Sequence, residues 1–272
     1  MTSFCQASAQ STARPVPSGG AAPQAASAPR YADIADLVLR SPVVLDSVIR
    51  SVSRLTGAQA VGAPPGMVRL YVEADVLALI RGSDAVPARI GWIIDVVPDA
   101  RGRIPNLRKQ RVLAFARPIA GRGNQLQLTG PDSQRAWTPA ADALTRRIIT
   151  ETIAADAPPR ITGIGNAFHV AGTLPGAGET QIFLQTENRR PVSLNVIRAP
   201  GEQPRWAVAL SEIVDESAAP PPPDTLLWYR LACGLPPALP PSALQTLEPG
   251  DQRAAAEDYR FILSALGPCT RG

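Results

Sequence analysis

The only histidine of the chain, His169, is the residue best suited to proton transfer near neutral pH. It belongs to the segment Asn166–Val170, and a glycine-rich stretch, Gly172–Gly178, follows it. A histidine beside a flexible loop could act as a general acid or base. The alternative, which we favour, is a histidine that is hydrogen-bonded to a loop carbonyl and takes part in no reaction.

A run of basic side chains is the second candidate. It lies between two predicted strands and comprises Arg101, Arg103, Arg108, Lys109 and Arg111. Arginine forms bidentate contacts with phosphate and carboxylate groups, so the run could bind an anionic polymer. No aromatic residue interleaves with it, and the net charge of the chain is only +4, so nucleic acid is not an expected partner. The alternative, which we favour, is a solvated hairpin loop.

The other residue types exclude most familiar active sites. One histidine and three scattered cysteines do not form a zinc site, and no G-x-x-x-x-G-K-[ST] or G-x-S-x-G motif occurs. Gly163-Ile164-Gly165 begins like a dinucleotide-binding fingerprint, but Phe168 stands where the third glycine belongs. We therefore assign no catalytic, cofactor-binding or metal-ligating residue and expect no cofactor.

Two cysteines, Cys233 and Cys269, bracket a small helical module near the end of the chain. This spacing predicts a structural disulfide and favours an oxidising compartment. The alternative is two unpaired buried thiols in a cytosolic protein.

Residues 1–30 are rich in alanine, serine, proline, glutamine and glycine and predict a disordered tail. Within this tail, Ala7-Ser8-Ala9 has the small-x-small pattern of a signal-peptidase site, although no charged n-region or long apolar h-region precedes it. We expect either the remnant of an incompletely recorded signal peptide or an ordinary low-complexity tail. Together with the cysteine pair, the first alternative predicts a periplasmic or secreted protein.

Hydrophobic periodicity predicts a mainly β first half. A helix over Tyr31–Arg40 comes first, because apolar residues recur there at i, i+3 and i+4. Strands with few helical signals between them follow, which favours an antiparallel meander or small barrel. They are Val43–Leu55, Met67–Ile80, Ile90–Val97, Val112–Ala116 and Gln125–Leu128. A central helix is predicted over Thr138–Ala154, with Thr138 as its N-cap and Pro139 at its first position.

The second half predicts a three-stranded antiparallel unit and a C-terminal helical hairpin, so the fold class is α+β. The strands are Thr180–Thr186, Val192–Arg198 and Trp206–Ile213, and the helices are Thr225–Cys233 and Asp251–Leu266. A stiff polyproline spacer, Pro220–Pro223, separates the two groups. We expect a tail (1–30), a mainly β module (31–135), a helix with three strands (136–218) and a spacer with a helical module (219–272). No apolar run is long enough to span a bilayer, so we expect no transmembrane segment.

The first module resembles the five-stranded barrel of exported OB-like domains of the tissue-inhibitor and netrin type. The likeness lies in Ala35–Val52, in the strand ending Ala78–Gly82 and in Val112–Phe115. This resemblance implies a fold and no activity.

The second unit resembles cyclophilins in Thr180–Leu184 and Trp206–Leu210, which match two core strands of that barrel. Phe168-His169 is similar to the Phe-His-Arg motif of that family, but Val170 replaces the catalytic arginine. The resemblance therefore implies a barrel with doubtful isomerase activity.

The whole chain also resembles uncharacterised exported proteins of alphaproteobacteria. Since catalytic constellations are missing, we expect a non-enzymatic periplasmic or secreted protein that binds a ligand or associates with the envelope. Two alternatives stay open: a degenerate enzyme with a cyclophilin-like barrel, and an anionic-polymer binder that uses the 101–111 loop. The ligand and the partner are unknown at this point.

Overall fold

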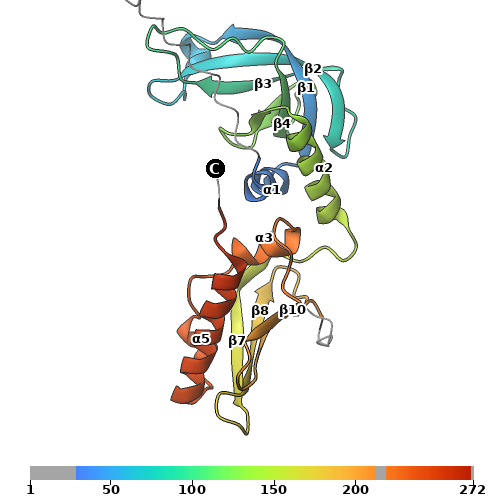
Figure 1. Cartoon of the computed structure of the whole chain (residues 1–272). Coiled ribbons are helices and arrows are strands. Elements are labelled where there is room, and N and C mark those ends of the chain that lie inside the picture. The colour runs from blue at the N-terminus through green and yellow to red at the C-terminus, as the bar shows by residue number, and fades with distance from the viewer. Residues whose placement is uncertain (1–28, 212–218, 271–272) are drawn as a thin grey trace, which may run out of the picture.

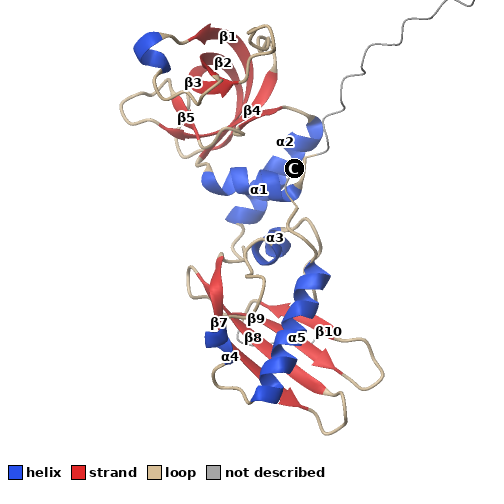
Figure 2. Cartoon of the chain, turned by 90° about the vertical axis from the view of Figure 1, so that its left-hand side faces the viewer, coloured by secondary structure: helices blue, strands red, loops and turns tan. Residues whose placement is uncertain are grey.

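The structure of the protein is a computed structural model that describes residues 29–211 and 219–270. It has one β-sheet at each end of an elongated molecule, with helices packed between the two sheets (Figures 1 and 2). The α+β class predicted from the sequence is confirmed. The predicted tail with Ala7-Ser8-Ala9 lies outside the described residues, apart from positions 29 and 30.

The first sheet is a curved antiparallel barrel. Its strands are β1 (Val43–Arg54), β2 (Val68–Arg81), β3 (Arg89–Val96), β4 (Arg111–Pro118) and β5 (Leu126–Leu128), in the order β3-β2-β1-β4-β5. A parallel bridge between Gly91 and Gln125 joins the first strand of this order to the last. A sixth strand, β6 (Gln134–Ala136), pairs with β4, and a short 3-10 helix, η1 (Gly57–Ala60), lies between β1 and β2.

Alternating apolar residues fill the barrel. Leu45 and Ile49 on β1, Val72 on β2, Trp92 on β3 and Ala114 on β4 are almost completely buried and belong to one core cluster. The register between β1 and β2 shifts three times, and such irregularities strengthen the twist that lets a sheet curl. The barrel therefore has a filled interior, and a ligand must bind on its outside or in the seam between β3 and β5.

The second sheet has four strands, not the three that the sequence predicts. They are β7 (Ile161–Ala171), β8 (Gly178–Thr186), β9 (Val192–Arg198) and β10 (Arg205–Ala209), in the order β10-β9-β8-β7. The additional strand is β7. Its two glycines, Gly163 and Gly165, and two register shifts against β8 hide the alternation of its buried residues.

The described residues also form five α-helices. They are α1 (Tyr31–Arg40), α2 (Pro139–Ile153), α3 (Leu226–Ala232), α4 (Pro241–Leu244) and α5 (Pro249–Leu266), and α5 covers one face of the second sheet (Figure 2). The predicted cap is present, because Oγ1 of Thr138 accepts a hydrogen bond from the backbone N–H of Ala141 at 3.1 Å. In the described ranges no helix is long and apolar enough to cross a membrane.

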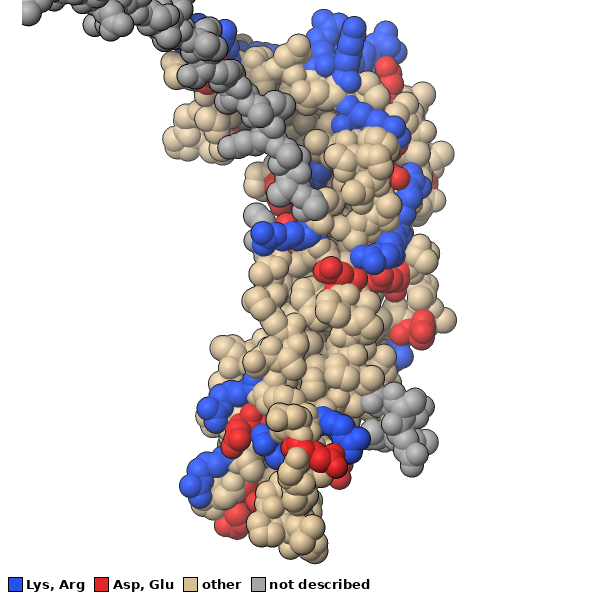
Figure 3. All heavy atoms as spheres, in the orientation of Figure 1, with Lys and Arg blue, Asp and Glu red and all other residues tan. Residues whose placement is uncertain are grey.

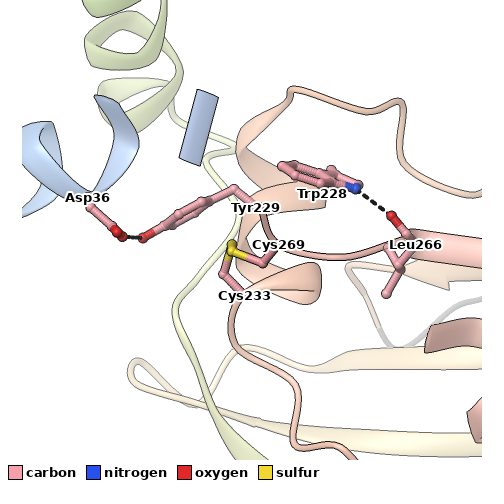
Figure 4. Close-up of a disulfide and its surroundings, with 6 residues drawn as sticks. All are labelled: Asp36, Trp228, Tyr229, Cys233, Leu266 and Cys269. Atoms are coloured by element: carbon pink, nitrogen blue, oxygen red, sulfur yellow. Dashed lines mark hydrogen bonds between the residues drawn. A yellow bond between two sulfur atoms is a disulfide. The ribbon is translucent and has the colours of Figure 1, made fainter. Parts of the chain in front are cut away.

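The predicted disulfide between Cys233 and Cys269 is present and ties the end of α3 to the segment after α5 (Figure 4). Beside it, Nε1 of Trp228 donates a hydrogen bond to the carbonyl of Leu266 at 2.9 Å. The C-terminal helices therefore form one stapled unit against the second sheet.

One hydrophobic core joins the segments that the sequence divides into modules. Helix α1 lies between the barrel, α2 and α3, and buried residues from both sheets belong to the same cluster as its apolar face. The Tyr31 hydroxyl donates to Glu151 on α2 at 2.5 Å, and the Tyr229 hydroxyl on α3 donates to Asp36 on α1 at 2.5 Å. The two ends of the molecule are thus packed together through α1.

Candidate functional site

A groove of about 640 Å³ opens along the seam of the barrel between β3 and β5. These two strands lie beside each other at one side of the barrel (Figure 2). Only the bridge at Gly91 and Gln125 joins them, so the rest of β3 is an edge strand. The groove is the place where a ligand can reach both the edge of a strand and the apolar interior.

The backbone of β3 has hydrogen-bonding groups that face this groove. Strand β3 pairs with β2 in antiparallel register, Trp92 opposite Val72 and Ile93 opposite Tyr71. The N–H of Gly91 donates to the carbonyl of Asn124 in the β4–β5 loop at 3.0 Å, so Gly91 faces away from β2. Because backbone groups alternate in direction along a strand, those of Ile93 and Asp95 also face away from β2. Within the described residues they have no backbone partner.

The floor of the groove is apolar. Trp92, Ile94, Leu126 and Leu128 line it, and Trp92 is only 1% exposed. Nε1 of Trp92 donates to Oε1 of Gln134 on β6 at 2.8 Å, which satisfies its polar atom and fixes the ring. The floor therefore offers a preformed place for apolar side chains.

The rim on the β2 side contains a paired charge. Nε and Nη2 of Arg69 donate to the two carboxylate oxygens of Asp95 at 2.9 and 2.8 Å, and these bonds raise the pKa of Arg69. The same guanidinium donates to the carbonyls of Val61 and Gly62 at 2.6 and 2.9 Å. Arg69 thus holds the β1–β2 loop at the end of the groove, and its charge is balanced by Asp95.

Tyr71 lies across β3 because position 91 is a glycine. A Cβ atom at Gly91 would be 2.1 Å from the hydroxyl oxygen of Tyr71, so no other residue fits there without moving the ring. Tyr71 also lines a second hollow of about 380 Å³, which shares Ile93, Arg122 and Gln125 with the first. The groove therefore continues past Tyr71 toward the β1–β2 loop.

The opposite rim is the β4–β5 loop. It contributes Ile119, Arg122 and Gln125, and Nη1 of Arg122 donates to the side-chain oxygen of Gln125 at 3.0 Å. Arg122 has no acidic partner among the described residues, so this rim is weakly positive. The site therefore combines an apolar floor, one balanced ion pair and one unbalanced cation.

His169 lies at the other end of the molecule, on β7 and not in a loop. Its Nδ1 is 2.8 Å from Oγ1 of Thr180, so the expectation of a loop carbonyl as partner is wrong. The Thr180 hydroxyl donates to Asp258 on α5, which also accepts a hydrogen bond from Nε of Arg198 at 2.5 Å. Since the Thr180 hydroxyl is the donor to Asp258, its oxygen accepts from His169, which places the imidazole proton on Nδ1. This network attaches α5 to the sheet.

The basic run does not converge on one site. Arg111 donates to both carboxylate oxygens of buried Asp46 at 2.9 and 2.6 Å and lies over the ring of Trp137.

The rest of the basic run lies on the surface. Arg103 pairs with Asp99, which also accepts from the backbone N–H of Arg101. Arg108 and Lys109 are exposed. The groove contains none of these five residues.

The groove residues themselves were not predicted as a site. The sequence predicts the strands that contain Tyr71, Trp92 and Asp95, and alternation places Arg69 and Tyr71 on one face of β2. It contains no signal for the seam between β3 and β5, because that seam depends on how the barrel closes. Among the described residues no cluster of three or more metal-ligating side chains occurs.

Comparison of the chain with protein-family models and with curated proteins finds no match. The function is therefore inferred from the groove, its backbone edge and the disulfide.

Proposed function

We propose that this protein is a non-enzymatic binding protein of an oxidising compartment, periplasmic or secreted, that holds an extended polypeptide segment in the β3–β5 groove. The observation that carries this proposal is the free edge of β3 directly above an apolar floor. An extended peptide can add to such an edge as a further strand, with main-chain hydrogen bonds supplying affinity and pockets supplying specificity.

The geometry favours particular features of the peptide. Side chains of an added strand alternate, so every second one would point toward Trp92 and Leu126. These positions should be apolar, because Ile94, Leu126 and Leu128 of the described floor have no polar side-chain atom and Nε1 of Trp92 already donates to Gln134. Arg122 on the opposite rim favours an acidic residue at one of the outward positions. The Arg69–Asp95 pair is balanced and adds little preference for charge.

The strand order of the barrel bears on which class of ligand the groove binds. β1 pairs with β2 and β4, and β3 lies parallel to β5 at the bridge, which is the order of an OB-type barrel. This supports the resemblance to exported OB-like domains. OB barrels bind oligonucleotides and oligosaccharides at the β2–β3 face and adjoining loops, so these are competing ligand classes for the same groove. The floor is apolar, and the aromatic side chains that line the groove are the half-buried Tyr71 and the buried Trp92, which favours a peptide over a stacked single strand.

The disulfide supports export. Disulfides persist in oxidising compartments and are rare in reducing ones, so the Cys233–Cys269 bond favours a periplasmic or secreted protein. The second sheet is an open four-stranded sheet, not the barrel that the cyclophilin resemblance implies, and Val170 stands where cyclophilins have arginine, so neither feature supports the cyclophilin-like alternative.

An anionic-polymer binder is a second candidate. Figure 3 shows lysine and arginine side chains gathered on the visible face of the barrel end, while the opposite end has both signs interspersed. Within the basic run, however, Arg103 and Arg111 are engaged by Asp99 and Asp46. Binding by the exposed remainder would weaken steeply with added salt, whereas peptide binding in the groove should change little.

The proposal can be tested by selecting peptides from a displayed library and comparing two substitutions at one position. Ile93→Pro removes the N–H that faces the groove but keeps the bonds between β3 and β2, and proline is tolerated at such edge positions. Ile93→Ala shortens the side chain and keeps the N–H. We expect Ile93→Pro to weaken the selected peptides about tenfold or more and Ile93→Ala to weaken them less.

Equal affinity of both variants would contradict strand addition at β3. A library that yields no binding peptide, while an oligosaccharide array or single-stranded DNA gives saturable binding, would replace the peptide by one of those ligands.

A further inference from the structure

A polar pocket of about 320 Å³, separate from the β3–β5 groove and from the hollow beside Tyr71, lies where α3 meets the start of β7. Its walls are held firmly. Cys233 is fixed by the disulfide, Tyr229 is fixed by its hydrogen bond to Asp36, and both residues are drawn in Figure 4. Gly234 approaches the carbonyl of Arg230 so closely that a Cβ atom there would be 2.4 Å from it. The pocket is lined by Arg160, Ile161, Tyr229, Arg230, Cys233 and Gly234.

Arg230 is partly buried in this pocket without a counter-ion. Its Nε is inaccessible to solvent and has no hydrogen-bond partner among the described residues. Neither Arg230 nor Arg160 forms an ion pair within residues 29–211 and 219–270. A buried donor without an acceptor destabilises a fold, and a charged one more so.

The two arginines are close enough to influence each other. Burial lowers the pKa of Arg230, and the positive charge of Arg160 lowers it further. Tyr229, Glu187 and Tyr31 act in the opposite direction, but Glu187 forms no ion pair with either arginine in the described part of the chain. The pocket therefore contains two neighbouring cations that no acidic side chain of the described ranges neutralises at hydrogen-bond distance.

We propose that this pocket is a binding site for a single oxyanion group, a phosphate or a carboxylate, held between Arg160 and Arg230. A planar guanidinium forms two parallel hydrogen bonds to such a group. Nε of Arg230 is closed to solvent, so the donors on that side would be its Nη groups, which have no acidic partner among the described residues. The volume admits one such group with part of the molecule that carries it, and no extended polymer. This site is separate from the β3–β5 groove and does not depend on the peptide proposal.

The site would also couple ligand binding to stability. Arg160 directly precedes β7, and Arg230 belongs to α3, whose Tyr229 contacts α1. An anion between the two guanidinium groups would join these elements. A ligand that binds only the folded chain raises its melting temperature in proportion to the logarithm of ligand concentration once the site is saturated.

The test is thermal unfolding together with calorimetric titration of inorganic phosphate, with acetate as the carboxylate probe and chloride at matched ionic strength. We expect saturable binding of phosphate or acetate and a rise in melting temperature beyond that in chloride. Arg230→Met and Arg160→Gln should each reduce the affinity about tenfold or more. Arg253→Met is the matched control, because Arg253 is an exposed arginine on α5 outside the pocket.

The melting temperature without added anion distinguishes an Arg230 that binds an anion from an Arg230 that only stabilises the fold. Without added anion, Arg230→Met should melt at the same temperature as the wild type or higher, since it removes an unpaired buried charge. If Arg230→Met fails to fold, exposed Arg160→Gln still decides the question. Wild-type affinity in Arg160→Gln, or no saturable binding of either probe, would overturn the proposal. The relative affinities of phosphate and acetate identify which oxyanion the site prefers.

Discussion

At the scale of single residues, Asp258 illustrates a buried polar group that joins α5 to the second sheet. Its side chain is only 1% exposed, yet Thr180 and Arg198 both donate hydrogen bonds to it. No pattern in the sequence could identify this network, because its partners are 78 and 60 residues away along the chain. His169 belongs to the same network through the contact of its Nδ1 with the Thr180 hydroxyl.

Replacing Asp258 by asparagine should lower the free energy of unfolding by about 3 kcal/mol, because the amide cannot accept hydrogen bonds from both donors. Urea denaturation measures the effect. Glu257→Gln is the control, since Glu257 is 65% exposed and 3.5 Å from Arg198, and it should change stability by about 0.5 kcal/mol or less. Equal effects of the two substitutions would show that Asp258 contributes no more than a surface charge.

At the scale of elements, hydrophobic periodicity predicts the bounds of those helices and strands in which the periodicity is clean. The bounds of α1 and β9 coincide with the predicted Tyr31–Arg40 and Val192–Arg198, because clean periodicity and flanking prolines define them. Strand β7 was missed because its glycines break the alternation, and β6 because three residues are too few for a pattern. The predicted strand Trp206–Ile213 corresponds to β10, which ends at Ala209, and residues 212 and 213 lie outside the described part.

The groove could not be predicted in the same way. Its strands were predicted individually, but its shape depends on β5 returning beside β3 and on the hydrogen bond of Gly91 to Asn124. Its ion pair joins Arg69 to Asp95, which are 26 residues apart. The disulfide, in contrast, was predictable because the two cysteines bracket one helical unit.

The disulfide should contribute about 4 kcal/mol to stability, because it closes a loop between cysteines 36 positions apart. We expect the Cys233→Ser, Cys269→Ser double variant to lose this amount relative to the oxidised wild type in urea denaturation. Adding a reductant should destabilise the wild type by a similar amount and leave the variant unchanged. If the reductant destabilises the wild type and the variant equally, reduction of the Cys233–Cys269 bond is not the cause of the lost stability.

At the scale of the whole molecule, α1 connects the two ends. Tyr31 packs against Trp228 and Tyr229 of α3 and donates its hydroxyl proton to Glu151 of α2. The sequence placed α1 in the first module, since periodicity shows that a helix has an apolar face but not which elements cover it. The two sheets therefore share one hydrophobic core through α1.

This connection predicts a dependence of stability on alkaline pH. Burial, and then the hydrogen bond to Glu151, raise the pKa of Tyr31 well above its ordinary value of 10.0. Above pH 10 the unfolded chain releases the Tyr31 proton while the folded chain retains it, so the free energy of unfolding falls as the pH rises. The free energy of unfolding of Tyr31→Phe should fall less steeply with rising pH than that of the wild type between about pH 10 and 11. If the free energies of unfolding of the wild type and the variant fall in parallel with pH, this account of Tyr31 is contradicted.

The most direct test of the proposed function is amide hydrogen exchange at β3, measured by NMR with and without a peptide selected from the displayed library. If the peptide adds as a strand, the amides of Ile93 and Asp95 should exchange at least about tenfold more slowly in the complex. The amides of Trp92 and Ile94, which face β2, should change much less. Unchanged exchange at Ile93 and Asp95 in a saturated complex would contradict binding at the β3 edge.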